Sequence, residues 1–163
     1  MHSASLLVSD INIEADLERV NRSVIEQMVD AFSNQDIDSI MNLFSDDAIY
    51  HDMVGSGEQG NSYLGKREIK SHFLENFKML PQHHYEDAIV LVSGNQAYAN
   101  WTLVIEGRSE ASPSLRVRGC DYFELEEGKV KLKTAWIKNQ RGMMLSLAIM
   151  RLRSFFDRLF SKN

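Results

Sequence analysis

The spacing of apolar residues divides the chain into a helical first half and a second half in which apolar and polar residues alternate. In the first half, apolar residues recur every three or four positions in three segments, which is the pattern of helices with one buried face. The apolar face of the first helix contains Ile13, Leu17, Val20, Val24, Met28 and Phe32. Ser9 or Asp10 can cap this helix, Asp36 or Asp38 can cap the second, and the third is predicted over residues 66–80.

In the second half the apolar period falls to two, which is the period of strands with one buried face. The predicted strands cover residues 84–92, 96–106, 115–126 and 129–138, with a shorter one at 48–52. Gly94-Asn95 and Glu127-Gly128 are typical of the tight turns that join antiparallel strands. The inner face of the last strand is predicted to carry Val130, Leu132, Thr134 and Trp136. Helices first and hairpins later indicate an α+β domain, with a curved antiparallel sheet wrapped around three N-terminal helices.

The last segment of the chain, residues 140–163, has a different character from the rest. Lys and Arg outnumber Asp and Glu by four in residues 141–163, and the apolar residues form one broad stripe. We expect a domain at 1–139 followed by a basic amphipathic helical tail at 140–163. The tail can pack on its own domain, swap onto a neighbouring copy, or lie on an anionic membrane surface as a peripheral contact. Packing against protein is the favoured alternative.

Composition narrows the class of protein. The chain has 163 residues, of which 44% are hydrophobic and 25% charged, as in a soluble single domain. A net charge of −5 gives no reason to expect nucleic acid as a partner. Cys120 is the single cysteine, so no internal disulfide can form, and this fits a reducing compartment. No secretory signal begins the chain and no apolar stretch is long enough to span a bilayer, so we expect a cytoplasmic protein.

Two carboxylates stand where the pattern makes them candidates for chemistry. Asp121 shares the otherwise apolar face of the strand 115–126, and burying a carboxylate there costs several kcal/mol unless it is paired or neutral. A β-bulge that turns Asp121 to solvent, or a structural hydrogen bond, would also explain its position. Asp52 ends the strand 48–52 with the parity of Tyr50, although aspartates at such ends are often turn residues. An exposed loop, Gly55–Gly60, follows it.

These carboxylates lie in segments that resemble a known superfamily. The run DIDSIMNLFSDDAIYHDMVGSG, Asp36–Gly57, resembles the nuclear-transport-factor-2-like (NTF2-like) superfamily, and within it the ketosteroid isomerases and the polyketide cyclases with a SnoaL-like domain. The run CDYFELEEGKV, Cys120–Val130, resembles a second motif of the isomerases. The resemblance covers roughly residues 21–138 and implies an NTF2-like cone that forms sheet-to-sheet homodimers. Members of this superfamily have many different functions, so the resemblance specifies the fold better than the activity.

For the isomerases, the resemblance implies that Asp52 is the general base and that Asp121 is the acid or enolate-stabilising donor. Ketosteroid isomerase uses a pair of this kind, in which one carboxyl is ionised and the other is neutral. Where the family has a tyrosine on the first helix, this chain has Met28, whose thioether cannot donate a hydrogen bond. Tyr50 is the candidate for the missing hydroxyl. The residues expected to bind substrate, or simply to pack the core, are Met28, Trp101, Phe123 and Trp136.

The sequence therefore favours a pocket protein that binds an apolar small molecule and uses neither a cofactor nor a metal. The histidines do not form a metal-binding set by their spacing. We expect acid–base catalysis of the isomerase or cyclase type, with proton abstraction next to a carbonyl of an apolar polyketide- or steroid-like compound. The alternative is a non-catalytic ligand-binding or protein-interaction module of the same fold, in which the basic tail docks a partner.

Overall fold

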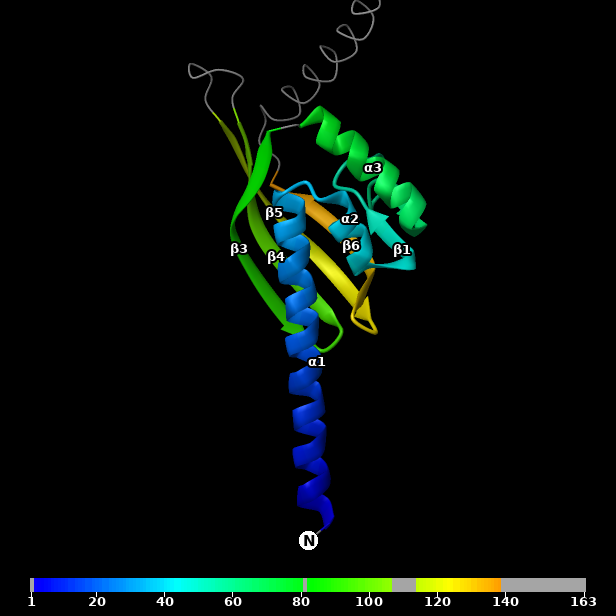
Figure 1. Ribbon diagram of the computed structural model, residues 1–163, viewed down its shortest axis with the longest axis vertical. Helices are drawn as coiled ribbons and strands as arrows, with labels where there is room; N and C mark the ends of the chain where they lie inside the picture. The colour runs from blue at the N-terminus through cyan, green and yellow to red at the C-terminus, as the bar shows by residue number, and fades with distance from the viewer. Residues whose placement is uncertain (1, 81, 107–113, 139–163) are drawn as a thin grey trace, which may run out of the picture.

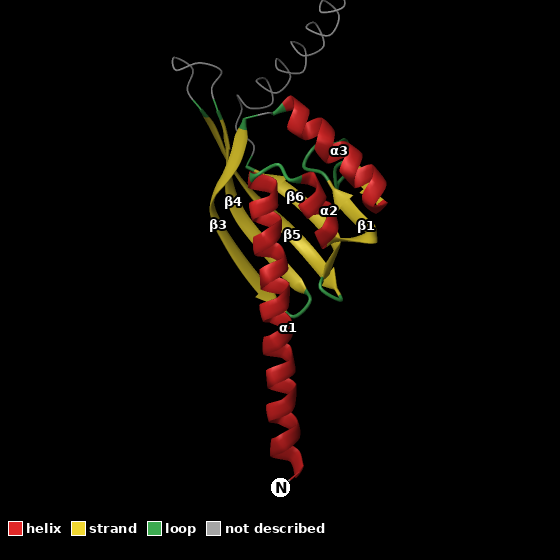
Figure 2. Cartoon of the chain, viewed as in Figure 1, coloured by secondary structure: helices red, strands yellow, loops and turns green. Residues whose placement is uncertain are grey.

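The computed structural model describes residues 2–80, 82–106 and 114–138, with side chains from residue 13 onward. It confirms a mixed α+β fold in which helices lie against one face of a curved, open, six-stranded sheet (Figure 1; Figure 2). That face is called the inner face below, and the opposite one the outer face. The predicted tail at 140–163 lies outside the described residues.

The helices match the predicted number in this part of the chain but not all of the predicted ends. They are α1 (His2–Ser33), α2 (Ile37–Leu43) and α3 (Gly65–Met79). The predicted start of α1 at Ser9 or Asp10 is wrong, because no glycine or proline interrupts the residues before them and the helix runs through. The cap of α2 is confirmed, since the Asp36 carboxylate accepts the backbone N–H of Ser39 at 3.1 Å.

Only the C-terminal half of α1 packs on the sheet. Ile25 and Met28 are buried, whereas Ile13 is 67% and Val20 47% exposed, so these two members of the predicted buried stripe do not reach the core. A 32-residue helix is about 48 Å long, which exceeds the length of an 11-residue strand, about 36 Å. The helix therefore extends past the sheet, and its N-terminal half projects from the body of the domain (Figure 1).

The sheet combines two long hairpins with a strand pair from earlier in the chain. Its strands are β1 (Phe44–His51), β2 (Ser62–Leu64), β3 (His83–Ser93), β4 (Gln96–Ile105), β5 (Leu115–Glu126) and β6 (Lys129–Ile137), in the order β2-β1-β6-β5-β4-β3. Both predicted hairpins are confirmed. β1 lies parallel to β6, and all the other neighbours are antiparallel. The short strand β2 was not predicted.

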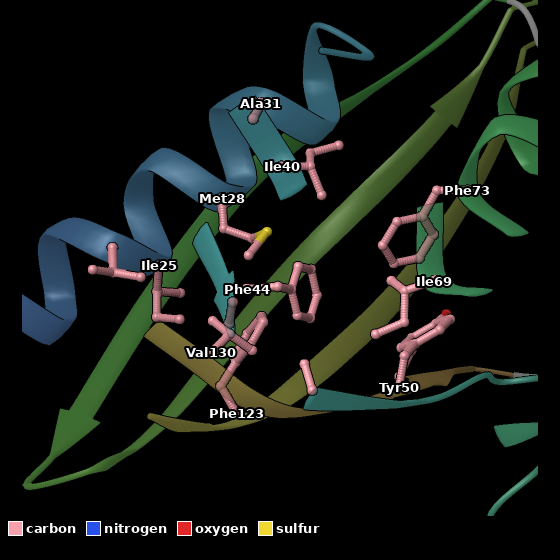
Figure 3. Packing of buried hydrophobic residues seen from close by; sticks show 14 of the residues in the cluster. Ile25, Met28, Ala31, Ile40, Phe44, Tyr50, Ile69, Phe73, Phe123 and Val130 are labelled. Atoms are coloured by element: carbon pink, nitrogen blue, oxygen red, sulfur yellow. The ribbon is translucent and has the colours of Figure 1, made fainter. Parts of the chain in front are cut away.

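The core fills the space between the inner face and the helices. Its largest fully buried side chains come from α1, α2, β1, α3, β5 and β6, so every layer contributes to it (Figure 3). They include Ile25, Met28, Ile40, Phe44, Ile69, Phe123 and Val130. One continuous core of this kind is what fixes the sheet's curvature around the helices.

A register shift in the β5–β6 pair changes which side chains of β6 face the core. Val130 pairs with Leu125, but the next inward pair is Lys133 with Phe123, with the shift between them. The predicted inner-face positions of Leu132, Thr134 and Trp136 are therefore wrong, because one extra residue reverses the alternation. Trp136 is 51% exposed on the outer face. Lys133 faces inward in its place.

Candidate functional site

Asp52 lies directly after β1 and is buried, with 8% of its surface exposed. The Tyr50 hydroxyl donates a hydrogen bond to Asp52 Oδ1 at 3.1 Å. The Nε2 atom of His72, from α3, lies 3.3 Å from Asp52 Oδ2. Asn76, one turn further along α3, places its Nδ2 atom 2.9 Å from the same ring nitrogen. Both carboxylate oxygens of Asp52 thus have polar partners, one from the sheet and one from a helix.

The loop after Asp52 is folded back onto it. The Asp52 N–H donates to the Asn61 carbonyl at 2.8 Å, and the Asn61 N–H donates to the Val54 carbonyl at 2.9 Å. Gly60 has a positive φ of 71°, and a Cβ atom there would lie only 1.9 Å from the Asp52 carbonyl oxygen. Only glycine allows this approach. The loop is largely exposed, as predicted, and it fixes the backbone from which the carboxylate projects.

Stacked rings hold the two partners of Asp52 in place. Tyr63 on β2 stacks against Tyr50, with ring centroids 6.0 Å apart, and against His72, with centroids 4.0 Å apart. Phe73 packs on the Tyr50 ring at 4.9 Å (Figure 3). Ring contacts of this kind restrict rotation of the side chains involved. The imidazole and the phenol therefore keep their orientation towards the carboxylate.

The surroundings of Asp52 favour its ionised form. Burial raises the pKa of Asp52, but the hydrogen bond and charge of His72, the Tyr50 hydroxyl and the Met53 N–H outweigh it and leave the pKa below its ordinary value. Burial, and then the charges of Asp52 and Asp121, raise the pKa of Tyr50 well above its ordinary value. The phenol therefore remains a neutral hydrogen-bond donor beside an ionised carboxylate.

Replacing His72 by phenylalanine should raise the pKa of Asp52 above its ordinary value of 3.8, because burial then dominates. The Asp52 contribution to wild-type stability is present at neutral pH and lost as the pH falls through the lowered pKa. In the variant, whose Asp52 pKa is raised, the ionised Asp52 instead lowers the stability of the protein at neutral pH. Titration of the Asp52 carboxyl carbon by NMR measures the shift. His51→Phe is the control, since His51 contacts Ser62 instead, and an unchanged pKa in the His72 variant would contradict this assignment.

The second carboxylate, Asp121, lies in the middle of β5 on the inner face and is 7% exposed, so the alternative in which a bulge turns it to solvent does not apply. Lys133 Nζ lies 2.8 Å from Asp121 Oδ1. The indole N–H of Trp101 donates to Asp121 Oδ2 at 3.0 Å. A charged group and a neutral donor thus compensate a carboxylate that would otherwise be costly to bury.

Gly119 makes room for the tryptophan that contacts Asp121. Trp101 on β4 pairs with Gly119 on β5, and a Cβ atom at Gly119 would lie 2.1 Å from the Trp101 ring. Real Cβ contacts are essentially never this short, so any larger residue would push the indole away. The glycine therefore allows the ring to lie over the strand with its N–H directed at Asp121.

Lys133 connects the two carboxylates. Its side chain is 5% exposed, and its Nζ atom lies 5.1 Å from the ring centroid of Tyr50, 5.5 Å from that of Phe32 and 5.6 Å from that of Phe123. Lys133 pairs with Tyr50 across the β1–β6 ladder, and the Tyr50 hydroxyl reaches Asp52. One tyrosine thus contacts both halves of the site.

The carboxylates stand at about the same level of the sheet. His51 pairs with Thr134, so Asp52 follows at the level of Ala135, and Ala135 pairs with Asp121. Two strand spacings place the Asp52 and Asp121 backbones roughly 10 Å apart. Ala135, whose side chain is small, lies between them on β6.

The structure places most of the predicted substrate-binding residues inside the domain. Met28, Trp101 and Phe123 are each 1–2% exposed in the core. Trp136 instead lines a hollow of about 340 Å³ on the outer face, together with Arg118 and Cys120 among others. His72 and Lys133 belong to the site but were not predicted from the sequence. The position of His72 next to Phe73, on the apolar face of α3, was a usable signal, whereas Lys133 depends on the register shift.

None of the helices in the described part of the chain is long and apolar enough to cross a membrane. Within the same residues, no three His, Cys, Asp or Glu side chains are grouped as metal ligands would be.

Comparison with known proteins gives a consistent result. The model of the SnoaL-like domain family matches residues 25–132. No curated protein matches the sequence significantly. Similar solved structures include a candidate polyketide cyclase from Xanthomonas campestris, with 16% identity, a TM-score of 0.62, and coverage of 80% of this chain and 98% of that one.

Two further structures are similar to the same extent. A phenazine biosynthesis-related protein from Pseudomonas aeruginosa has 18% identity and a TM-score of 0.64, and the match covers 78% of this chain and 85% of that one. A candidate ketosteroid isomerase from Kribbella flavida has 15% identity and a TM-score of 0.60, with coverage of 76% and 81%. At these identities the likeness concerns the fold, and it confirms the predicted NTF2-like architecture.

Proposed function

The chain belongs to the SnoaL-like domain family, and from that premise we propose that it is a proton-transfer enzyme. Its substrate would be an apolar polyketide- or steroid-like compound, and the reaction would begin with removal of a proton next to a carbonyl group. The candidate cyclase and isomerase of similar fold support this class of substrate, although each name applies to its own protein.

The observation that carries the proposal is the environment of Asp52. A carboxylate that is 8% exposed, yet has its pKa lowered, is ionised at neutral pH without being surrounded by bulk water. Burial means that Asp52 can accept a proton without first losing a full hydration shell, while the lowered pKa keeps it ionised and makes it a weaker base, which suits an activated C–H beside a carbonyl. Turn residues at strand ends, the alternative interpretation of Asp52, are normally exposed.

Tyr50 and His72 would then position the base. The Tyr50 hydroxyl has a single proton, and it donates that proton to Asp52 Oδ1. We therefore propose that Tyr50 holds the base in position. The sequence had suggested that its hydroxyl would replace the missing hydrogen-bond donor to the enolate. His72 faces the other oxygen. In the reaction, Asp52 takes a proton from carbon, the electron pair moves onto the carbonyl oxygen as an enolate, and Asp52 returns the proton to the same compound at another position.

For Asp121 the geometry supports a role other than the one that the resemblance implied. A neutral carboxyl that donates to an enolate needs a free O–H, but Asp121 Oδ2 accepts the Trp101 N–H, and Oδ1 is ion-paired with the Lys133 ammonium at 2.8 Å without forming a directed hydrogen bond. We propose that Asp121 acts as a carboxylate that holds the Lys133 ammonium in the site. It is then a positioning residue and does not itself contact the substrate.

The non-catalytic alternative is favoured by a different part of the molecule. On the outer face, the exposed apolar side chains of Ile89, Leu91, Tyr98 and Trp136 come from β3, β4 and β6. Scattered exposed apolar residues are normal, but several on one sheet face suit an interaction surface. A protein-interaction module would use this face and leave the inner carboxylates without a chemical role.

Proton exchange with solvent tests the proposed function without knowledge of the natural substrate. The protein would be incubated in D₂O with a panel of cyclic ketones and 1,3-diketones, and loss of the α-C–H signal followed by proton NMR. We expect exchange of at least one compound well above the rate in buffer, because proton abstraction precedes any isomerisation or cyclisation. Saturable binding without exchange across the panel would contradict catalysis and support the binding module.

A further inference from the structure

The Lys133 ammonium has more hydrogen-bond donors than the protein satisfies. An ammonium carries three N–H groups. Within residues 2–80, 82–106 and 114–138, Nζ forms an ion pair with Asp121 Oδ1, at 2.8 Å. The other neighbours at Nζ are the ring faces of Tyr50, Phe32 and Phe123. One carboxylate oxygen and three aromatic rings thus surround the ammonium of a side chain that is only 5% exposed, so one ion-pair partner stands against three N–H groups.

Ring faces attract a cation but do not replace oxygen acceptors. A buried polar group that lacks its hydrogen bonds destabilises the fold, and a methionine would fill the same space without that cost. The outward-facing Lys131 on the same strand shows the ordinary arrangement, with its ammonium close to the carboxylates of Asp47 and Glu126. The unsatisfied donors of Lys133 thus mark a place where an oxygen from outside the protein fits.

We propose that Lys133 binds an anionic oxygen of the ligand, so that the ligand is an apolar ring compound bearing a carboxylate or an enolate oxygen. The ammonium supplies the charge and two donors, and charge-assisted hydrogen bonds are about twice as strong as neutral ones. The three aromatic rings around Nζ suit a flat apolar body beside that oxygen. Asp121 keeps the ammonium in place and leaves those donors directed away from itself.

This inference deepens the proposed function and rests on it for one point, the identity of the anionic oxygen during turnover. Tyr50 separates Lys133 from Asp52, with its ring against the ammonium and its hydroxyl on the carboxylate. A substrate in contact with Tyr50 would have its α-carbon near the base and its carbonyl oxygen near the ammonium. The enolate that forms when Asp52 removes the proton is then stabilised by Lys133.

Benzoate and benzamide test the charge preference, because they share a ring and differ in the charge of the oxygen-bearing group. Trp136→Phe gives a background in which Trp101 is the single tryptophan, and its indole contacts Asp121 in the site. Quenching of Trp101 fluorescence then reports binding. We expect benzoate to bind at least about tenfold more tightly than benzamide, as a charge-assisted hydrogen bond implies. Lys131→Met in the same background should keep this preference.

The decisive variant removes both charges of the buried pair. Lys133→Met alone leaves Asp121 unpaired and can fail to fold, so Lys133→Met with Asp121→Asn is used. We expect it to bind benzoate and benzamide equally. A preference for benzoate that survives in this double variant would overturn the inference, and so would equal or undetectable binding of the two probes at millimolar concentration by the protein with Lys133 intact.

The outcome is separable from that of the proposed function. The probes report binding, and the deuterium assay reports proton abstraction. A protein that prefers benzoate but exchanges no ketone keeps the Lys133 site and loses the catalytic proposal. A protein that exchanges ketones with no preference for benzoate does the reverse.

Discussion

Replacing Asp52 by asparagine should abolish measurable α-proton exchange, a loss of about 100- to 10,000-fold. Asparagine has nearly the same shape, and its amide oxygen can still accept the Tyr50 hydrogen bond at the Oδ1 position. What it lacks is the ability to take up a proton at neutral pH. The variant thus removes the base while the surrounding rings remain packed. Deuterium exchange of a responsive ketone, followed by NMR, measures the effect.

Asp46→Asn is the matched control for this experiment. Asp46 lies on β1, like the residues leading to Asp52, but its side chain is 96% exposed and paired with Lys66. Neutralising it changes the net charge of the protein by the same amount and should leave the exchange rate within about twofold, as expected for a surface position. Retention of the wild-type rate by the Asp52 variant would show that another group removes the proton and would end the catalytic assignment.

Replacing Lys133 by methionine should lower the free energy of unfolding by about 3–5 kcal/mol. Methionine fits the apolar surroundings of the Lys133 stem, so little packing is lost. The penalty arises because Asp121, 7% exposed, stays buried while its ammonium partner is gone. Trp101 continues to donate to Oδ2, but a neutral donor does not compensate a buried charge. Urea denaturation followed by circular dichroism measures the change.

Combining Lys133→Met with Asp121→Asn should recover most of that stability, since a buried ion pair replaced by neutral groups is often tolerated. Lys131→Met tests the outward position on the same strand, where the lysine pairs with exposed carboxylates and the expected loss is about 1 kcal/mol or less. A Lys133 variant no less stable than the Lys131 variant would show that the inner pair does not balance two buried charges.

The parts of the fold that follow from local pattern were predicted well. The apolar period of α3 and the turn residues Gly94-Asn95 and Glu127-Gly128 act over a few neighbouring positions, so one sequence suffices to place them. The parallel pairing of β1 with β6 and the short strand β2 depend on contacts between distant segments. No local pattern encodes which strand β1 will join.

The site residues also divide into those that the local sequence predicts and those that depend on contacts between distant segments. Asp121 was found because a carboxylate on an apolar face is costly, and its 7% exposure agrees with that reasoning. Lys133 was missed because one extra residue between Val130 and Lys133 reverses the alternation on β6, and the sequence of the strand does not show this. His72 was not predicted as a partner of Asp52. Its contact with Asp52 requires α3 to lie beside the end of β1, and this tertiary packing is not visible in the local sequence.

The parallel pairing of β1 with β6 also determines when the site can exist during synthesis. Tyr50 leaves the ribosome with the first part of the chain, but its ladder partner, Lys133, is made 83 residues later. Chains are made at roughly 5–20 residues per second, so β1 waits for several seconds without its neighbour. For most of that interval His72 has already been synthesised, but Asp52 still lacks the strand beside which it is buried. A nascent chain that ends before β6 therefore lacks part of the candidate site.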